Sequence, residues 1–562
     1  MAPLGPGDPG HRDPRGPAPG DRLHLHGPPG AESGAGADGP GRDLVRGPPG
    51  RRVRGRGDGG SRGGPRPPGA PVSLPPPDSG GSSGSPDSLP PDSSPVDEAA
   101  VGRSLAGLRH LGAGPGKRLA LQVHPDRHGV AAVLAAARTG ATISLLHPRW
   151  TRAETSRVLA SFQPHVYVPA TDDMAPTDVG LDTRLVPVAM VSRQVRDVPA
   201  TRQDTEGLRA RWVLWSSGTT GRARGLVLDD AALEASGRAV ARRMGLGPGD
   251  RWLATLSPAH VGGLALIFRS RWPGSQVVPL SRFEAGEVNR QMDQGAVTHL
   301  SLVPTQLLRL LEDRQDAPFP ETVKGILVGG APTPPALLRR ALDAGAPVAL
   351  TWGMTELGSQ VATAEPARVR ARPGGVGPPL PGVEVRIDQA RGPVLGEGIP
   401  SGELLVRGPT LATGTWVGPG QTPVPLPLED GWFRTGDVGR LDARGELTIT
   451  GRIADRIITG GVNVEPAEVE AALLELPWVR EAAVVGMPDP EWGQRVVAVV
   501  APLGAGGAEG TARAPGLGEL REALADRLQP AKRPRELVVV RALPRRPNGK
   551  VDREALRQLA GG

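Results

Sequence analysis

Short apolar segments alternate with amphipathic segments along this chain, and this rhythm constrains the fold more than any other feature. The apolar segments predict strands at residues 118–123, 142–146, 297–303, 325–328 and 348–351. The amphipathic segments predict helices at residues 105–111, 129–138, 230–244, 305–312 and 334–343. Strands that alternate with helices form a largely parallel sheet covered by helices. The sequence therefore predicts an α/β domain.

The pattern changes beyond residue 374. Short alternating segments at 383–387, 402–406 and 446–450 are separated by Gly and Pro, which predicts a β-rich subdomain. A smaller α+β piece follows from about residue 453. We therefore expect a Gly/Pro-rich extension at 1–97, a large domain at 98–452 and a small mobile domain at 453–562.

Composition narrows the class of protein. The chain has 80 Gly and 63 Pro, which are densest in residues 1–97. Few large apolar residues occur there, so we expect this extension to be disordered or the product of a misassigned start. The net charge of +7 comes from scattered arginines and aromatic residues make up only 3%, which disfavours nucleic-acid binding. The absence of cysteine excludes disulfides and thiolate chemistry. No apolar stretch is long enough to span a bilayer, and a cytoplasmic protein is expected.

One loop has the chemistry of a phosphate-binding site. An apolar segment at 212–215 runs into a set of hydroxyl and glycine residues: Ser216, Ser217, Gly218, Thr219, Thr220 and Gly221. Glycines let backbone N–H groups converge on an anion, and Arg224 adds a fixed charge that can bind two oxygens. The spacing differs from that of a P-loop, and a run of Ser, Thr and Gly is also typical of a flexible loop. The flanking strand and the helix at 230–244 favour the phosphate interpretation.

Four further segments follow the loop. They are Thr351–Glu356, Gly431–Asp437, Gly451–Glu470 and Pro547–Lys550. In this order and spacing, the five segments resemble the adenylate-forming superfamily, which includes acyl-CoA synthetases, luciferases and peptide-synthetase adenylation domains. The resemblance covers the chain from about residue 101 onward. It implies a large N-terminal domain of α/β sheets with a β-rich subdomain, a hinge, and a small C-terminal domain.

The resemblance also implies roles for individual residues, with ATP, Mg²⁺ and coenzyme A as ligands. The implied nucleotide-binding residues are Ser216, Ser217, Gly218, Thr219, Thr220, Gly221, Arg224, Gly330, Ala331, Trp352, Asp437 and Arg452. Arg224 stands where the family usually has lysine, and Trp352 where it usually has tyrosine. The implied metal ligand is Glu356, the catalytic residues are Lys550, Thr355 and His260, the hinge residue is Asp455, and the coenzyme A contacts are Gly460 and Gly461.

Each charged position also has an interpretation without chemistry. Glu356 could be a solvated acid at a helix start, and Asp437 a turn residue before a strand. Arg452 and Asp455 could form a surface ion pair, and Lys550 could be an ordinary turn lysine. The joint occurrence in register favours the functional set, because activation of a carboxylate on the ATP α-phosphate joins two anions and needs positioned positive charge.

Candidate substrate residues follow from the same resemblance. No acid lies near residues 257–260, where peptide-synthetase domains bind an α-amine, so amino-acid activation is disfavoured. The segments 268–270, 297–305 and 353–361 resemble o-succinylbenzoate–CoA ligases of menaquinone synthesis. That substrate carries a second carboxylate and a ketone, which need a polar pocket. The candidates are Arg269, Thr305, Ser359 and Gln360, although Arg269 fits a surface helix position equally well.

Two alternatives stay open from the sequence. One is a CoA ligase for another aryl or short acyl acid. The other is a degenerate relative that binds nucleotide without turning it over. The expected partners are a small carboxylic acid, ATP and coenzyme A, with neither nucleic acid nor a membrane span, and a homo-oligomer is possible.

Overall fold

The computed structural model describes residues 94–170, 184–185, 191, 211–217, 223–270, 274–389, 401–503, 516–546 and 550–561. Most of the predicted extension, up to residue 93, lies outside this range. Helix α1 (Glu98–His110) follows Asp97, whose carboxylate accepts a hydrogen bond from the Ala100 amide at 2.7 Å and caps the helix.

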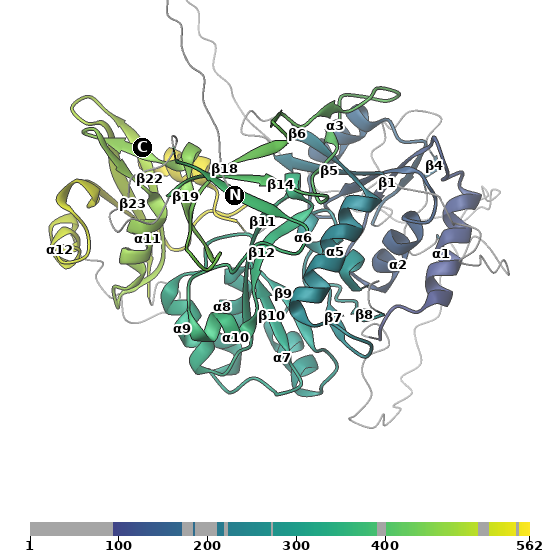
Figure 1. Ribbon diagram of the computed structural model, residues 1–562, viewed down its shortest axis with the longest axis horizontal. Helices are drawn as coiled ribbons and strands as arrows, with labels where there is room; N and C mark the ends of the chain where they lie inside the picture. Colours follow the sequence, from purple (N-terminus) through teal and green to yellow (C-terminus); the bar gives the residue numbers. More distant parts are fainter. Residues whose placement is uncertain are drawn as a thin grey trace, which may run out of the picture. The chain divides into compact units, whose positions relative to one another are not determined.

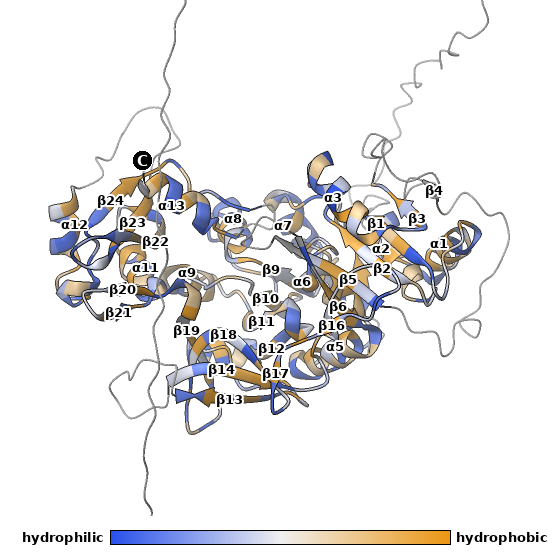
Figure 2. Cartoon of the chain, turned by 90° about the horizontal axis from the view of Figure 1, so that it is seen from above, coloured by the Kyte–Doolittle hydropathy of each residue, from blue (hydrophilic) through white to orange (hydrophobic). Residues whose placement is uncertain are grey.

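An eight-stranded sheet forms the first layer, in the strand order β16-β15-β6-β5-β2-β1-β3-β4. Figure 1 labels its strands β6, β5, β1 and β4. Its strands are β1 (Arg118–Gln122), β2 (Thr142–Leu146), β3 (Val166–Val168), β4 (Arg184–Leu185), β5 (Arg211–Ser217), β6 (Ala223–Asp229), β15 (Gly414–Thr415) and β16 (Val424–Pro425). The strands β4, β3, β1, β2 and β5 run parallel, whereas β6 and β15 pair antiparallel. Strands β1 and β2 are hydrophobic and buried, as a sheet covered on both faces requires (Figure 2).

A six-stranded sheet, ordered β12-β11-β10-β9-β7-β8, forms the second layer. Its strands are β7 (Arg251–Leu253), β8 (Gln276–Val278), β9 (His299–Leu302), β10 (Gly325–Val328), β11 (Val348–Met354) and β12 (Ser359–Ala364). All pairs are parallel except β11 with β12.

The described helices of these two layers connect and cover the sheets. They are α2 (Arg127–Ala136), α3 (Arg152–Phe162), α5 (Asp230–Met244), α6 (Val261–Ser270), α7 (Ala285–Asp293), α8 (Pro304–Arg314), α9 (Pro335–Asp343) and α10 (Pro366–Ala371). Helices α5 and α6 pack against both sheets: Leu233 and Ile267 join the core of the first, while Ala241 and Leu266 join Trp252 of the second. Helix α5 spans the predicted residues and ends at Gly245 in the left-handed conformation (φ 65°).

A five-stranded antiparallel sheet confirms the predicted β-rich subdomain. It contains β13 (Glu384–Asp388), β14 (Ser401–Arg407), β17 (Leu428–Glu429), β18 (Trp432–Leu441) and β19 (Leu447–Arg452). Strand β18 pairs with β19 and sets Asp437 opposite Arg452. The sheet therefore brings together two predicted site residues from separate motifs.

The C-terminal part forms a fourth sheet with its own core. Its strands are β20 (Ile457–Thr459), β21 (Val462–Val464), β22 (Val479–Asp489), β23 (Gly493–Pro502) and β24 (Glu536–Val539). Its helices are α11 (Pro466–Leu474), α12 (Leu517–Ala523) and α13 (Arg553–Gly561). Val484, Val496 and Leu473 pack on one face of the sheet, and Val485, Val497 and Leu556 on the other. The predicted α/β fold class is confirmed.

Candidate active site

The phosphate loop connects two antiparallel strands, β5 and β6. Residues Gly218, Thr219, Thr220 and Gly221 lie outside the described residues, while the backbones of Ser216 and Ser217 belong to the end of β5. The ladder sets Ser216 opposite Arg224, so that the arginine flanks the loop. The exposed Arg224 guanidinium donates to the Thr415 hydroxyl from Nη2 (2.9 Å) and Nε (3.2 Å). Thr415 of β15 was not predicted as a site residue; it stabilises the position of this cation.

Asp437 lies at the centre of a buried polar cluster. Trp352 Nε1 donates to Asp437 Oδ2 at 2.7 Å, and Arg452 Nε donates to Asp437 Oδ1 at 2.6 Å. The aspartate is only 4% exposed and the indole 7%, whereas the arginine side chain is 56% exposed. The surface ion pair of Arg452 with Asp455 is therefore wrong, because Arg452 pairs with Asp437 and Asp455 pairs with Arg553 (3.3 Å).

Thr355 and Glu356 lie in a single 3₁₀ turn, η4 (Thr355–Leu357), directly after β11. Both side chains are half-buried. The strand before them has a bulge at Gly353, where a Cβ would collide with the carbonyl of Ser359. Ser359 itself has φ 104°, a conformation that costs free energy for a residue with a side chain and is often found at functional sites. This strained corner fixes where the Thr355–Glu356 turn leaves the sheet.

Lys550 approaches Asp437 and Glu356 from the C-terminal part of the chain, and the residue is exposed. Its Cε lies 3.9 Å from the position that a Cβ on Gly330 would occupy. Gly330 (φ 80°) and Ala331 form the exposed loop that follows β10. Loss of hydration around the ammonium and the nearby Arg452 lower the Lys550 pKa, while Asp437 and Glu356 oppose that shift. The residues before the lysine, Pro547 to Gly549, lie outside the described residues.

His260 precedes α6, and its carbonyl accepts the first amides of that helix. Its ring centroid lies 5.0 Å from that of His147. Burial, with a smaller contribution from the Lys550 ammonium, lowers the His260 pKa to about 4. The imidazole is therefore neutral near pH 7, and its buried Nε2 has no hydrogen-bond partner among the described residues.

The substrate candidates Arg269 and Gln360 contact each other in the interior. Arg269, on the last turn of α6, is 1% exposed, so the surface-helix interpretation is wrong. Its Nη2 donates to Gln360 Oε1 at 2.7 Å, Nη1 lies 3.4 Å from Ser301 Oγ, and the guanidinium stacks 4.4 Å from the Trp252 ring centre. All three partners are uncharged. Thr305 is half-buried in the first turn of α8.

The structure explains why positions 460 and 461 are both glycine, which the sequence alone did not. They form the exposed two-residue turn between β20 and β21, and both have positive φ, 55° and 78°. Such a turn requires left-handed residues at both positions, which favours glycine. A Cβ on Gly460 would also meet the Trp492 ring at 2.6 Å.

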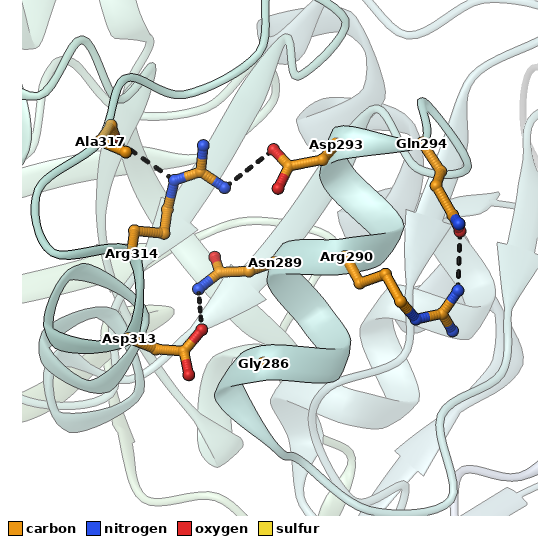
Figure 3. Close-up of a pocket in the computed structure, with 8 residues that line it drawn as sticks. All are labelled: Gly286, Asn289, Arg290, Asp293, Gln294, Asp313, Arg314 and Ala317. Carbon is orange, nitrogen blue, oxygen red and sulfur yellow. Dashed lines mark hydrogen bonds and ion pairs between the residues drawn. The ribbon is translucent and has the colours of Figure 1, made fainter.

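A surface hollow of about 470 Å³ lies between α7 and α8, away from these residues (Figure 3). Its polar groups bind one another: Asn289 donates to Asp313 at 2.8 Å, and Arg314 pairs with Asp293 at 3.0 Å. None of the predicted site residues lines it. The candidate active site is therefore the region around Asp437, Glu356 and Lys550, where the charges of the two acids act on the lysine.

No group of three or more His, Asp or Glu side chains arranged to hold a metal occurs within the described residues. Glu356 alone fits an Mg²⁺ ion that is bound mainly through phosphate oxygens, because such ions commonly use one or two carboxylates. The helices of the described part of the chain all lack the length and apolar character that a bilayer crossing needs.

Comparison with known proteins agrees with this geometry. The family model of the AMP-binding enzymes matches residues 98–416, more than half of the chain, and the model of the AMP-binding enzyme C-terminal domain matches residues 468–550. A 2-succinylbenzoate–CoA ligase of Bacillus thuringiensis subsp. konkukian is 30% identical over 455 residues, which are 80% of this chain and 90% of that protein. The corresponding ligase of Bacillus mycoides is 30% identical over 458 residues, with the same coverage.

Solved structures show the same relationship. The o-succinylbenzoate CoA synthetase (MenE) from Bacillus subtilis, in complex with the acyl-adenylate intermediate OSB-AMP, has a TM-score of 0.70 and 28% identity over 82% of this chain and 92% of that one. The same enzyme with ATP and magnesium ion has a TM-score of 0.69. ATP-bound MatB from Rhodopseudomonas palustris has a TM-score of 0.69 and 27% identity, covering 84% of this chain and 97% of that one. The motifs, the fold and the matched domains together show that the chain belongs to the AMP-binding enzyme family, the adenylate-forming superfamily that its motifs resemble.

Proposed function

We propose that this protein is an ATP-dependent acid–CoA ligase that forms an acyl-adenylate and then an acyl-CoA thioester. The observation that carries the proposal is the position of Lys550. Lys550 is exposed, and its ammonium lies near enough to Asp437, Arg452 and Glu356 for their charges to act on its pKa. Two cations, Lys550 and Arg452, beside two acids suit a substrate that brings its own negative charge, as ATP does.

In the first half-reaction, the substrate carboxylate attacks the ATP α-phosphate and pyrophosphate leaves. Asp437 would accept hydrogen bonds from the ribose hydroxyls, held in place by Trp352 and Arg452. Arg224 would bind the β- and γ-phosphates, and Thr355 and Lys550 the α-phosphate, where negative charge accumulates. Mg²⁺ bound by Glu356 would neutralise further phosphate charge. Catalysis then rests on positioning and electrostatics, which this set of side chains can supply.

In the second half-reaction, the thiol of coenzyme A attacks the acyl carbon and AMP leaves. The large domain at 98–452 would stay in place while the small domain at 453–562 turns about the segment near Asp455. That rotation would remove Lys550 from the site and bring the exposed turn at Gly460 and Gly461 toward the acyl group. The neutral His260 is suited to line the path of an uncharged thioester.

We further propose o-succinylbenzoate as the acid. The relatives named above support it, and so does Arg269. A buried guanidinium with uncharged partners is costly unless an anion completes its environment. The second carboxylate of o-succinylbenzoate would do so, with Gln360, Ser359 and Thr305 as polar neighbours. A ligase that consumes ATP and coenzyme A is expected in the cytoplasm, and a homo-oligomeric state stays a prediction.

A pyrophosphate-exchange assay with a panel of acids tests this proposal. We expect exchange to depend on o-succinylbenzoate and Mg²⁺, and the thioester to form once coenzyme A is added. Faster pyrophosphate exchange with another aryl or short acyl acid would support the ligase activity but identify that acid, and not o-succinylbenzoate, as the substrate. Nucleotide binding without exchange on any acid would favour the degenerate relative.

Changing Trp352 to phenylalanine should raise the KM for ATP by roughly tenfold, because a hydrogen bond to a charged group contributes about 1.5 kcal/mol or more. Phenylalanine keeps an aromatic ring but loses the Nε1 donor to Asp437. The measurement is the KM for ATP in the full reaction, with the urea midpoint recorded to check folding.

Trp432→Phe is the matched control, because Trp432 lies on the same strand as Asp437 and stacks with the surface residues Arg386 and Arg407. We expect its KM for ATP to stay at the wild-type value. An unchanged KM in Trp352→Phe would mean that Asp437 does not need the indole to bind ribose.

A further inference from the structure

Two short segments, residues 544–546 and 550–552, pair antiparallel in the arm that presents Lys550. The Asp552 amide donates to the Pro544 carbonyl at 2.8 Å, and the Arg546 amide donates to the Lys550 carbonyl at 2.8 Å. Helix α13 begins directly after the second segment, at Arg553. The position of the catalytic ammonium therefore depends on how the base of this arm is held.

Arg553 binds three groups at that base. Its Nη1 donates to the Val484 carbonyl at 2.7 Å, its Nη2 pairs with Glu470 Oε1 at 3.1 Å, and its Nε lies 3.3 Å from Asp455 Oδ2. The same Glu470 oxygen accepts the Val484 amide at 2.9 Å. Arg553 and Asp455 are each 27% exposed, so water weakens their attraction only in part.

These three contacts differ in what they connect. Val484 lies on β22 and Glu470 on α11, and both elements share one core, so they move together with Arg553. Asp455 instead ends the 3₁₀ turn η6 (Ile453–Asp455), which directly follows the last strand of the β-rich subdomain. The Arg553–Asp455 pair therefore joins the base of the lysine arm to the segment about which the small domain would turn.

We propose that Arg553 is a positioning residue that couples the hinge segment to the lysine arm. By pairing with Asp455, it favours the hinge geometry in which Lys550 lies in the candidate site, and the pair must loosen before the small domain can turn for the second half-reaction. The inference rests on the proposed two-step function. The effect of the Arg553–Asp455 pair on the hinge backbone can nevertheless be measured without any activity.

Three variants test it: Asp455→Ala, Arg553→Gln and, as a control, Arg545→Gln. Arg545 pairs with Glu481 at 3.0 Å at the base of the same arm. In Asp455→Ala and Arg553→Gln we expect the ratio of the adenylation rate to the thiolation rate, the latter measured from supplied adenylate, to fall about two- to fivefold, the scale of a partly exposed ion pair. The control should keep the wild-type ratio, and the double variant should be no worse than either single one.

Hydrogen exchange of the hinge amides gives a readout that does not depend on activity. The Arg456 amide donates to the Arg452 carbonyl at 3.1 Å, and we expect its exchange to accelerate in Asp455→Ala and Arg553→Gln but not in Arg545→Gln. Equal losses in both half-reactions, or unchanged hinge exchange, would overturn the coupling. If the wild-type protein showed no acid-dependent pyrophosphate exchange, the proposed function would be refuted. The hydrogen-exchange measurement would still show whether the Arg553–Asp455 pair orders the hinge.

Discussion

Lys550→Ala should slow adenylation by about 10²–10³-fold, the usual cost of removing one preorganised charge donor from a transition state. Thiolation of supplied acyl-adenylate should stay within a few-fold of the wild-type rate. The two half-reactions separate because the ammonium contacts developing phosphate charge only in the first.

The geometry explains the size of this effect. The ammonium lies beside the Gly330 loop, and the charges of Asp437 and Glu356 act on it. Without the Lys550 ammonium, these two acids would repel the two anionic substrates, the ATP triphosphate and the acid's carboxylate. Removing the cation leaves the acids in place, so the site loses one positive charge where the phosphates would bind.

Single-turnover measurement of pyrophosphate release and of thioester formation from supplied adenylate checks the result. Lys532→Ala is the matched control, because Lys532 belongs to the same C-terminal part and pairs with Glu468 at 2.7 Å on its surface. We expect both half-reactions of this control to be unchanged. A similar loss in both half-reactions of Lys550→Ala would contradict the catalytic role and point to a structural one.

Local signals explain which elements could be predicted from the sequence. Strands β2 and β10 match their predicted bounds, because each is a short apolar run bounded by Gly or Thr. Helix α5 matches because an amphipathic pattern ends at Gly245. Strand β6 was not predicted, because it is defined by antiparallel pairing with β5. In the sequence, its first residues resemble the end of the phosphate loop. The two-residue strands β15, β16 and β17 are too short to give a periodic pattern, and β15 also depends on pairing with the remote strand β6.

In the candidate site, too, some features could be predicted from local motifs and others depend on contacts between distant residues. The motifs identify the residue types at the site, and β18 with β19 sets Asp437 beside Arg452 as their resemblance implied. The sequence could not show that the Trp352 indole donates to Asp437, because 85 positions separate the two residues. Arg553 was not singled out either, since its acid partners lie on remote elements. Contacts of this kind depend on tertiary packing, which a single sequence does not reveal.

The burial of Arg269 is the most informative of these tertiary facts. The sequence left the residue equally compatible with a surface position, but it lies at 1% exposure between Gln360 and the Trp252 ring. Burial lowers its pKa to about 9, so the guanidinium is still charged near pH 7. Gln360 pairs with Gly353 across the β11–β12 ladder, so this charge lies next to the strand that leads to Glu356.

Arg269→Met should lower kcat/KM for o-succinylbenzoate by about 10²–10³-fold, because losing one partner of a buried charge pair costs several kcal/mol. The keto-acid analogue that lacks the ring carboxylate should be used by the variant as well as by the wild type. Methionine has a similar length, and replacing an unpaired buried charge by an apolar side chain does not destabilise a core. The thermal midpoint of the variant should therefore equal or exceed that of the wild type.

Two further variants make the result specific to charge. Gln360→Glu keeps Arg269 but supplies an internal carboxylate for it, so we expect a loss for o-succinylbenzoate similar to that of Arg269→Met. Arg290→Met, in the surface hollow between α7 and α8, should leave both substrates unaffected. If Arg269→Met lowered kcat/KM equally for the diacid and the analogue, the guanidinium would stabilise the pocket without binding the second carboxylate. Another acid would then have to be sought as the natural substrate.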